Sequence, residues 1–302
     1  MGRLRISIVE FLNTAPLVWG FTDGPLAGRY DLSFTVPSQC AQELRTGAAD
    51  IAIIPAIEYQ RMDGIVALPS MSVAAKGEVR SILVIAKKPI EMARRFALDT
   101  SSRSSIALVQ LLCRNFWGIS PEFVRNAPDP ASMLAHADAA LIIGDPALKI
   151  AVKMEQLAKK KGSADPCCGN EPEEQVVPGI DSLYVYDVAH QWREMTARPC
   201  VLAIWAVRAG VATPEVVDDF LSSKDYGLAR IKEISEGASL KLDLPAPALE
   251  RYLRENIDFS LDDDNLAGLN LYYEQCAEAG LIFIARPLEF ALAGRPVSRS
   301  HD

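Results

Sequence analysis

Apolar and polar positions alternate along the first ninety residues in a pattern that predicts strands separated by helices. Residues 5–11 alternate and predict a first strand, and residues 30–36 predict a second. A helix is expected to begin at Pro37 and to end before Gly47. Residues 50–55, which read DIAIIP, form the continuous apolar run of a strand buried on both faces. This order predicts a parallel sheet with crossover helices.

One more strand completes the first part of the chain, the same pattern restarts after residues 87–89, and the chain ends in a helical segment. Further strands are predicted at residues 79–86, 96–98, near Val124, and at 139–143, 183–188 and 200–207. Short helices are predicted at residues 133–137 and 191–195, and longer ones at 214–222, 226–235, 247–256 and 265–279. The polar segment at residues 159–179 is expected to be an exposed loop.

These elements form two α/β units, and the chain crosses between them near residues 88–98 and again near 198–202. We therefore expect an α/β fold with two lobes around one cleft. Residues 1–90 and 201–302 would form one lobe, including the C-terminal helices, and residues 91–200 would form the other.

The segment Asp99–Ser105 carries more hydroxyl groups than one helix start needs. It reads DTSSRSS and precedes an amphipathic apolar run, which predicts a helix N-terminus capped by one of the serines. The surplus hydroxyls, the free N–H groups, the helix dipole and Arg103 could together bind a carboxylate or phosphate. A cap with solvated serines is the alternative.

Other candidate site residues follow predicted strands. Asn13 comes after the first strand, at the sheet edge where ligands bind in open α/β folds, although a turn residue is the alternative. Glu58 is more consistent with an ion pair or a solvated side chain than with a general base. Asp145 is a turn former or a site residue. His136 and His190 lack any partner motif.

Composition and charge exclude several classes of protein. The chain has 302 residues, 49% of them hydrophobic and 23% charged, as in ordinary soluble domains. A formal net charge of -8 argues against nucleic acid or an anionic membrane as a partner. No apolar run suggests a secretion signal or a membrane span, so a cytoplasmic location is expected.

The sequence also lacks the common catalytic and metal-binding motifs. No phosphate-binding loop, dinucleotide fingerprint, nucleophile elbow or zinc-protease motif is present, and there is no internal repeat. The six cysteines form no C-x-x-C pair, so we expect reduced thiols and no metal site. No cofactor is expected.

Several short stretches in a fixed order resemble the chorismate dehydratase family of the futalosine route to menaquinone. The matching stretches are Phe11–Leu17, Val36–Ser38, Asp50–Pro55 with Glu58–Tyr59, Val79–Ser81, Asp99–Ser105, Leu141–Asp145, Tyr252–Leu253 and Gly280–Leu281. The resemblance implies a type II periplasmic-binding-protein fold and the conversion of chorismate, by loss of water, to 3-[(1-carboxyvinyl)oxy]benzoate.

The resemblance also implies roles for individual residues. Asn13 and Ser81 would carry the chemistry, while the base would be a weak protein group or the enolpyruvyl carboxylate of the substrate. The residues implied in substrate binding are Thr14, Ser38, Pro55, Ala56, Thr100, Ser101, Ser102, Arg103, Ser105, Gly144 and Asp145. The small molecule chorismate would be the partner, and the oligomeric state stays open.

Two alternatives and one departure accompany this resemblance. A protein of the same fold could bind an organic anion without transforming it. The related 1,4-dihydroxy-6-naphthoate synthase carries a histidine where this chain has Gly144 and Asp145, which favours the dehydratase. The family usually has Thr-Gly-Leu-Pro before its return strand, whereas this chain has Thr196–Pro199, which reads TARP.

Overall fold

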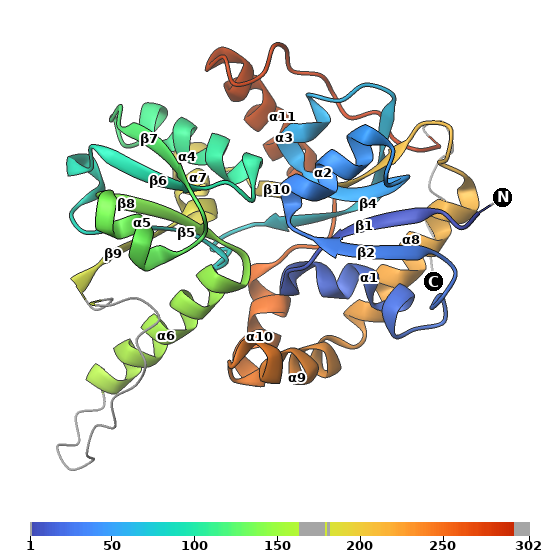
Figure 1. Cartoon of the computed structure of the whole chain (residues 1–302), viewed down its shortest axis with the longest axis horizontal. Coiled ribbons are helices and arrows are strands. Elements are labelled where there is room, and N and C mark those ends of the chain that lie inside the picture. The colour runs from blue at the N-terminus through green and yellow to red at the C-terminus, as the bar shows by residue number, and fades with distance from the viewer. Residues whose placement is uncertain (1, 163–178, 180–181, 293–302) are drawn as a thin grey trace.

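Two five-stranded sheets form the framework of this computed structural model, which describes residues 2–162, 179 and 182–292 (Figure 1). The first sheet has the order β2 (Asp31–Thr35), β1 (Arg5–Val9), β3 (Ile51–Pro55), β10 (Cys200–Arg208) and β4 (Ile65–Ala75). The second has the order β7 (Glu122–Asn126), β6 (Arg95–Asp99), β8 (Ala139–Ile143), β5 (Ile82–Ala86) and β9 (Tyr184–Asp187). The prediction of an α/β fold with two lobes is confirmed.

The sheets are mixed, which corrects the prediction of a parallel sheet. Strands β2, β1 and β3 are parallel, as the strand and helix order predicted. Strand β10 returns from the distant part of the chain and lies antiparallel between β3 and β4. In the second sheet, β5 lies antiparallel to both β8 and β9. The long connection that brings β10 back leaves no local signal of its direction.

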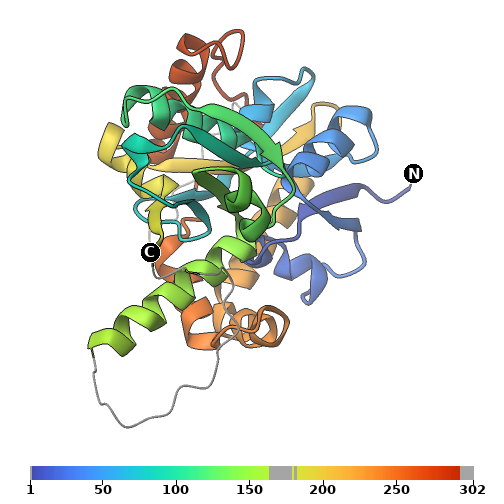
Figure 2. The same ribbon diagram turned by 60° about the vertical axis from the view of Figure 1, so that its left-hand side comes forward.

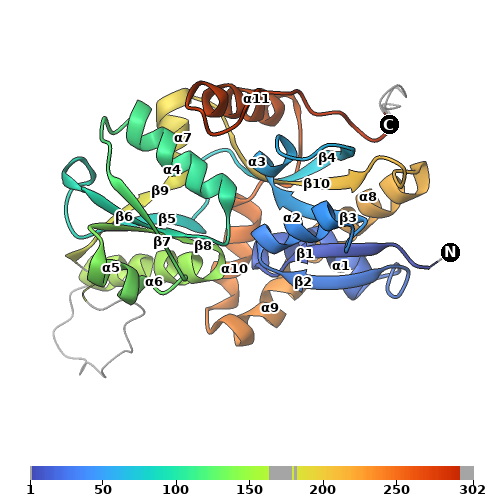
Figure 3. The same ribbon diagram turned by 45° about the horizontal axis from the view of Figure 1, so that its top comes forward.

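Helices cover both faces of each sheet (Figure 3). Those of the first lobe are α1 (Ala15–Thr22), α2 (Pro37–Thr46), α3 (Ala56–Tyr59), α8 (Pro214–Leu228), α9 (Ile231–Leu242), α10 (Ala246–Arg251) and α11 (Asp263–Glu278). Those of the second lobe are α4 (Arg103–Asn115), α5 (Pro130–His136), α6 (Gly144–Gly162) and α7 (Val188–Thr196). Short helical turns are η1 (Leu12–Thr14), η2 (Ile90–Met92) and η4 (Tyr252–Asn256).

Several predicted elements match closely, and the reason is local. Strand β3 is buried at every residue, as its continuous apolar run predicted. Helix α2 begins at Pro37 and is followed by Gly47 in the left-handed conformation, with φ of 74°. The predicted helix over residues 226–235 is wrong, because the chain breaks at Arg230 between α8 and α9.

The position of β5 bears on where the lobes divide. This strand was expected in the first lobe, yet it pairs with β8 and β9 of the second sheet. We therefore propose that the first crossing lies between Ala75 and Ile82 rather than near residue 90. One apolar cluster extends from the first sheet across the junction to one face of the second sheet, so the two lobes are packed together.

Two further expectations concern the segment after β8. Helix α6 begins at the junction of the lobes and runs away from it (Figure 2), and it includes residues 159–162 of the expected loop. Apart from Gly179, the rest of that loop lies outside the described residues, as do Cys167 and Cys168. Within the described ranges, no helix is both long and apolar enough to cross a membrane.

Candidate active site between the lobes

A small cavity of about 40 Å³ lies where the carboxyl ends of β1, β3 and β8 meet the start of β5 and the N-terminus of α4. This is the edge at which α/β sheets bind ligands. Its lining residues are Val9, Phe11, Asn13, Thr14, Pro37, Pro55, Val73, Ser81, Ile82, Ser102, Ser105, Ile143, Gly144, Leu202 and Ala203. Seven of the residues that the resemblance implies in the site therefore line one cavity, although they are spread along the chain from Asn13 to Gly144.

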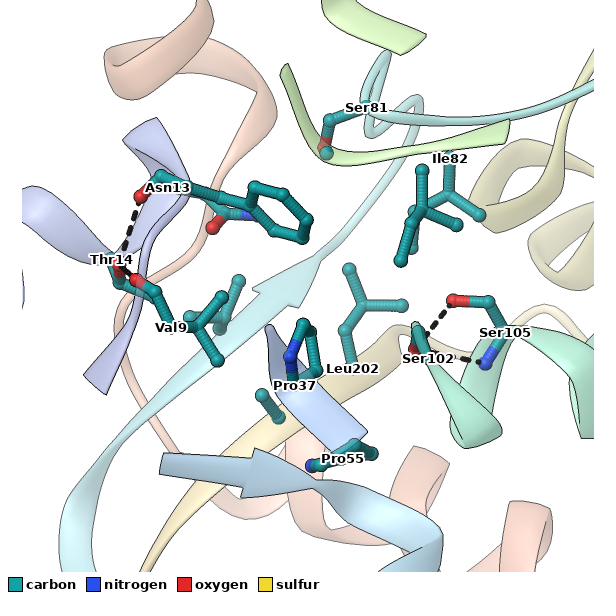
Figure 4. A pocket seen from close by; sticks show the side chains of 15 residues that line it. Val9, Asn13, Thr14, Pro37, Pro55, Ser81, Ile82, Ser102, Ser105 and Leu202 are labelled. Atoms are coloured by element: carbon teal, nitrogen blue, oxygen red, sulfur yellow. Dashed lines mark hydrogen bonds between the residues drawn. The ribbon is translucent and has the colours of Figure 1, made fainter. Parts of the chain in front are cut away.

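At one side of the cavity, Asn13 and Ser81 are joined by a tyrosine (Figure 4 labels the first two). The Tyr252 hydroxyl donates a hydrogen bond to Ser81 Oγ at 2.8 Å. Burial raises the pKa of the Tyr252 phenol, although hydrogen bonds with the side chains of Ser81 and Asn13 oppose that rise. The two residues expected to carry the chemistry thus share one partner.

The backbone around Ser81 is held by the carboxylate of Asp187. It accepts hydrogen bonds from the N–H groups of Val79 at 3.1 Å and Arg80 at 2.6 Å, and it also caps α7. Burial raises the pKa of Asp187, and these N–H groups counter the rise. Arg80 has a φ of 61°, a left-handed conformation uncommon for a residue with a side chain. Ser81 is therefore presented by a constrained turn.

The opposite side of the cavity is the N-terminus of α4. Ser102 is the cap residue, and its Oγ accepts from Ser105 N at 3.5 Å and lies 3.0 Å from Ser105 Oγ. Both serines are buried. Figure 4 shows the apolar side chains of Ile82 and Leu202 between this serine pair and Ser81. The cavity thus has hydroxyl groups at both sides and an apolar middle.

The remaining hydroxyls of the segment Asp99–Ser105 face other partners. Ser101 donates to Asp99 Oδ1 through its N–H at 2.9 Å and its hydroxyl at 2.5 Å. Thr100 is exposed. Ser104 Oγ accepts from the N–H of Ile57 at 3.1 Å, which joins the two lobes. Of the groups expected to bind an anion, only Ser102, Ser105 and the free N–H groups of the helix N-terminus therefore face the cavity.

Arg103, which was expected to help bind the anion, does not line the cavity. Its guanidinium forms an ion pair with Glu58 at 2.8 Å. The structure thus bears out the interpretation of Glu58 as an ion-paired residue.

Three other residues implied in binding lie at the lobe junction outside the cavity lining. The Ser38 N–H donates to the carbonyl of Ser101 at 2.9 Å. The carbonyl of Ala56 accepts from the Tyr273 hydroxyl at 2.8 Å. Asp145 Oδ1 accepts from the N–H of Leu12 at 3.0 Å. Each hydrogen bond helps to hold the lobes or their helices in place.

A second cavity of about 490 Å³ lies on the other side of Phe11, and Asp145 lines it. Burial raises the pKa of this carboxyl group, an effect that the hydrogen bond from Leu12 partly offsets. Thr14 borders both cavities, but its hydroxyl lies within 2.8 Å of the carbonyls of both Val9 and Phe11. The Thr14 side chain therefore stabilises the turn after β1.

Reasoning from sequence named Tyr252 only within a matching stretch and gave no site role to Tyr252 or Asp187. Tyr252 lies in a stretch with helical apolar spacing, which is the usual signature of a core residue. Asp187 lies within the predicted strand at residues 183–188, and in the structure it is an ordinary helix cap at the end of β9. Neither His136 nor His190 lines the cavity, and the described part of the chain contains no cluster of metal-ligating side chains.

Comparison with known proteins gives the family and the fold. The family model described as "Menaquinone biosynthesis" matches residues 4–278. The chorismate dehydratase of Thermus thermophilus is 27% identical over 241 residues, which cover 79% of this chain and 84% of that protein. A solved protein of Archaeoglobus fulgidus superposes with a TM-score of 0.68 at 18% identity, covering 92% of this chain and 98% of the other.

Periplasmic binding proteins share the same architecture. The alkanesulfonate-binding protein of Xanthomonas axonopodis pv. citri, solved with MOPS bound, has a TM-score of 0.58 at 14% identity and covers 94% of this chain and 96% of its own. At this identity the likeness shows the fold alone, and it confirms the expected periplasmic-binding-protein-like fold.

Proposed function

We propose that this chain, which belongs to the menaquinone biosynthesis family, is an enzyme that eliminates water from chorismate and forms 3-[(1-carboxyvinyl)oxy]benzoate. The name of the Thermus thermophilus relative supports this substrate. The observation that carries the proposal is the cavity between the lobes. Its described lining has hydroxyl and amide groups at both sides, apolar walls, and no side chain that ionises near neutral pH.

The serine pair would bind the ring carboxylate of chorismate. Ser102 and Ser105 lie at the N-terminus of α4, where free N–H groups and the helix dipole favour a negative charge. The apolar side chains of Ile82 and Leu202 would contact the ring. This placement points the other side of the ring, with its C4 hydroxyl, toward Asn13 and Ser81.

The chemistry is a loss of the C3 proton and the C4 hydroxyl. The electron pair of the C3–H bond forms the new ring double bond as the C4–O bond breaks. The base takes the C3 proton and passes it to the departing hydroxyl, so that one water is lost. Ser81 would donate a hydrogen bond to the departing oxygen, and Asn13 would orient the reacting face. Because no ionisable side chain lines the described cavity, we infer that the enolpyruvyl carboxylate of the substrate takes the C3 proton.

The cavity must widen before this reaction can begin. A volume of about 40 Å³ holds a few water molecules at most, far less than a ten-carbon substrate. Hydrogen bonds such as those from Ile57 to Ser104 and from Leu12 to Asp145 join the lobes, and they would have to break for the cavity to widen. Separation and closure of the lobes around the substrate would exclude water from the reacting centre.

Incubation of the purified protein with chorismate tests this function. We expect loss of the diene absorbance and a product lighter by one water in mass spectrometry. Asn13→Ala is expected to fold normally and to lower turnover at least about a hundred-fold, as removal of an oriented polar group does in other enzymes. Binding of chorismate without consumption would instead indicate an organic-anion binding protein.

A further inference from the structure

Tyr252 connects the two residues to which the proposed reaction assigns chemistry. It is the first residue of η4, a π-helical turn that follows α10, and its side chain is 1% exposed. Its hydroxyl lies 2.8 Å from Ser81 Oγ and also interacts with the side chain of Asn13.

The direction of this hydrogen bond determines what Ser81 can offer to a substrate. A serine hydroxyl has one proton and two lone pairs. Since Ser81 Oγ accepts the proton of Tyr252, its own proton is available for another acceptor. No described residue accepts that proton, and Ser81 lines the cavity. An oxygen atom of a bound molecule is the acceptor that this geometry fits.

We propose that Tyr252 is a positioning residue, which turns the Ser81 hydroxyl so that its proton points at the leaving C4 oxygen of the substrate. This inference rests on the proposed function. Without the Tyr252 hydroxyl, Ser81 Oγ would rotate freely among its staggered positions and would donate to the substrate for part of the time. The tyrosine therefore acts on the rate of the chemical step and much less on binding.

A separate ion-pair network holds the two partners at this distance. The Glu155 carboxylate binds Arg251 at 2.6 and 2.7 Å and Arg80 at 2.7 Å. These two arginines directly precede Tyr252 and Ser81 in the chain. One carboxylate on helix α6 thus binds both the η4 turn and the turn that carries Ser81. This arrangement is expected if the hydrogen bond between Tyr252 and Ser81 must keep its geometry.

The test is Tyr252→Phe, which keeps the ring and removes the hydroxyl. We expect kcat to fall about ten-fold to a hundred-fold while KM changes less than about three-fold, because the lost interaction acts mainly in the transition state. Tyr30→Phe is the matched control. Tyr30 is also buried, and its hydroxyl donates to Asp219 far from the cavity. That variant should lose stability and keep the kcat of the parent protein.

A double variant separates positioning from direct contact with the substrate. If Tyr252 acts through Ser81, then Ser81→Ala and the double variant Ser81→Ala/Tyr252→Phe should have the same kcat within about two-fold. The double variant also removes both partners of the hydrogen bond, so it is expected to fold even if Tyr252→Phe alone does not.

The outcomes distinguish this inference from the proposed function. A parent protein that does not consume chorismate overturns both. An active parent with an equally active Tyr252→Phe variant overturns the positioning role and leaves the function intact. A double variant ten-fold slower than Ser81→Ala also overturns it, because Tyr252 would then act on the substrate itself.

Discussion

Arg103 Nη1 lies 2.8 Å from Oε2 of Glu58, and this ion pair joins α4 of the second lobe to α3 of the first. Glu58 is fully buried and also binds Arg45 and Arg61. Burial alone would raise the pKa of Glu58, but the three arginines outweigh it and lower the pKa. The arginine expected to bind the substrate instead helps to hold the lobes together.

Glu58→Gln should therefore destabilise the protein at neutral pH. The expected loss is about 3 kcal/mol in the free energy of unfolding, because three arginines lose their shared charge partner. Since the pKa of Glu58 is lower in the folded than in the unfolded chain, the contribution is present above about pH 4.5 and fades as pH falls further. Urea unfolding at pH 7 and pH 3.5 measures this; a loss equal at both pH values contradicts it.

Ser102→Asp should separate stability from binding. A carboxylate at a helix N-cap is favourable, so the melting temperature should hold or rise, yet the charge would lie where a substrate carboxylate binds. We expect turnover of chorismate to collapse. Thr213→Asp makes the same kind of change at the N-cap of α8 and should keep parental turnover. Normal activity in Ser102→Asp would show that the serine is a cap alone.

Gly144→Ala tests the position of the Phe11 ring, which borders both cavities. Gly144 has a φ of 67°, and an added Cβ would lie 2.6 Å from the Phe11 ring. Gly118 has a φ of 64° with no atom within 4 Å of the added Cβ, so Gly118→Ala measures the backbone cost alone, about 1 kcal/mol. Gly144→Ala should lose more stability than this control and should also lose activity. Equal losses of stability in the two variants would mean that the ring moves freely.

Asp145→Asn should raise the melting temperature at pH 7. Burial raises the pKa of Asp145 in the folded chain, so ionisation of this carboxyl costs stability as pH rises above the unfolded value of 3.8. An asparagine can still accept the hydrogen bond from Leu12 without a charge. The gain should disappear near pH 3, where the carboxyl is protonated in both states. A lower melting temperature at pH 7 contradicts the expectation.

The sequence by itself determined the local elements and much of the cavity's polar lining. The apolar run of β3, the proline and glycine that bound α2, and the hydroxyl cap of α4 each depend on neighbours within a few residues. Asn13, Thr14 and Gly144 follow β1 and β8, and they lie around one cavity because the carboxyl ends of parallel strands meet at one edge. Ser81 precedes β5 and reaches that edge only because β5 runs antiparallel to β8, a direction that the sequence did not predict.

Tertiary structure decided which groups meet. The direction of β10, the pairing of Arg103 with Glu58, and the hydrogen bond of Tyr252 with Ser81 join positions from 45 to more than 150 residues apart. Such pairs leave no mark in local spacing, because a buried tyrosine or a surface arginine has the same sequence pattern whatever its partner. Their chemistry is set when the long connections bring the two lobes together.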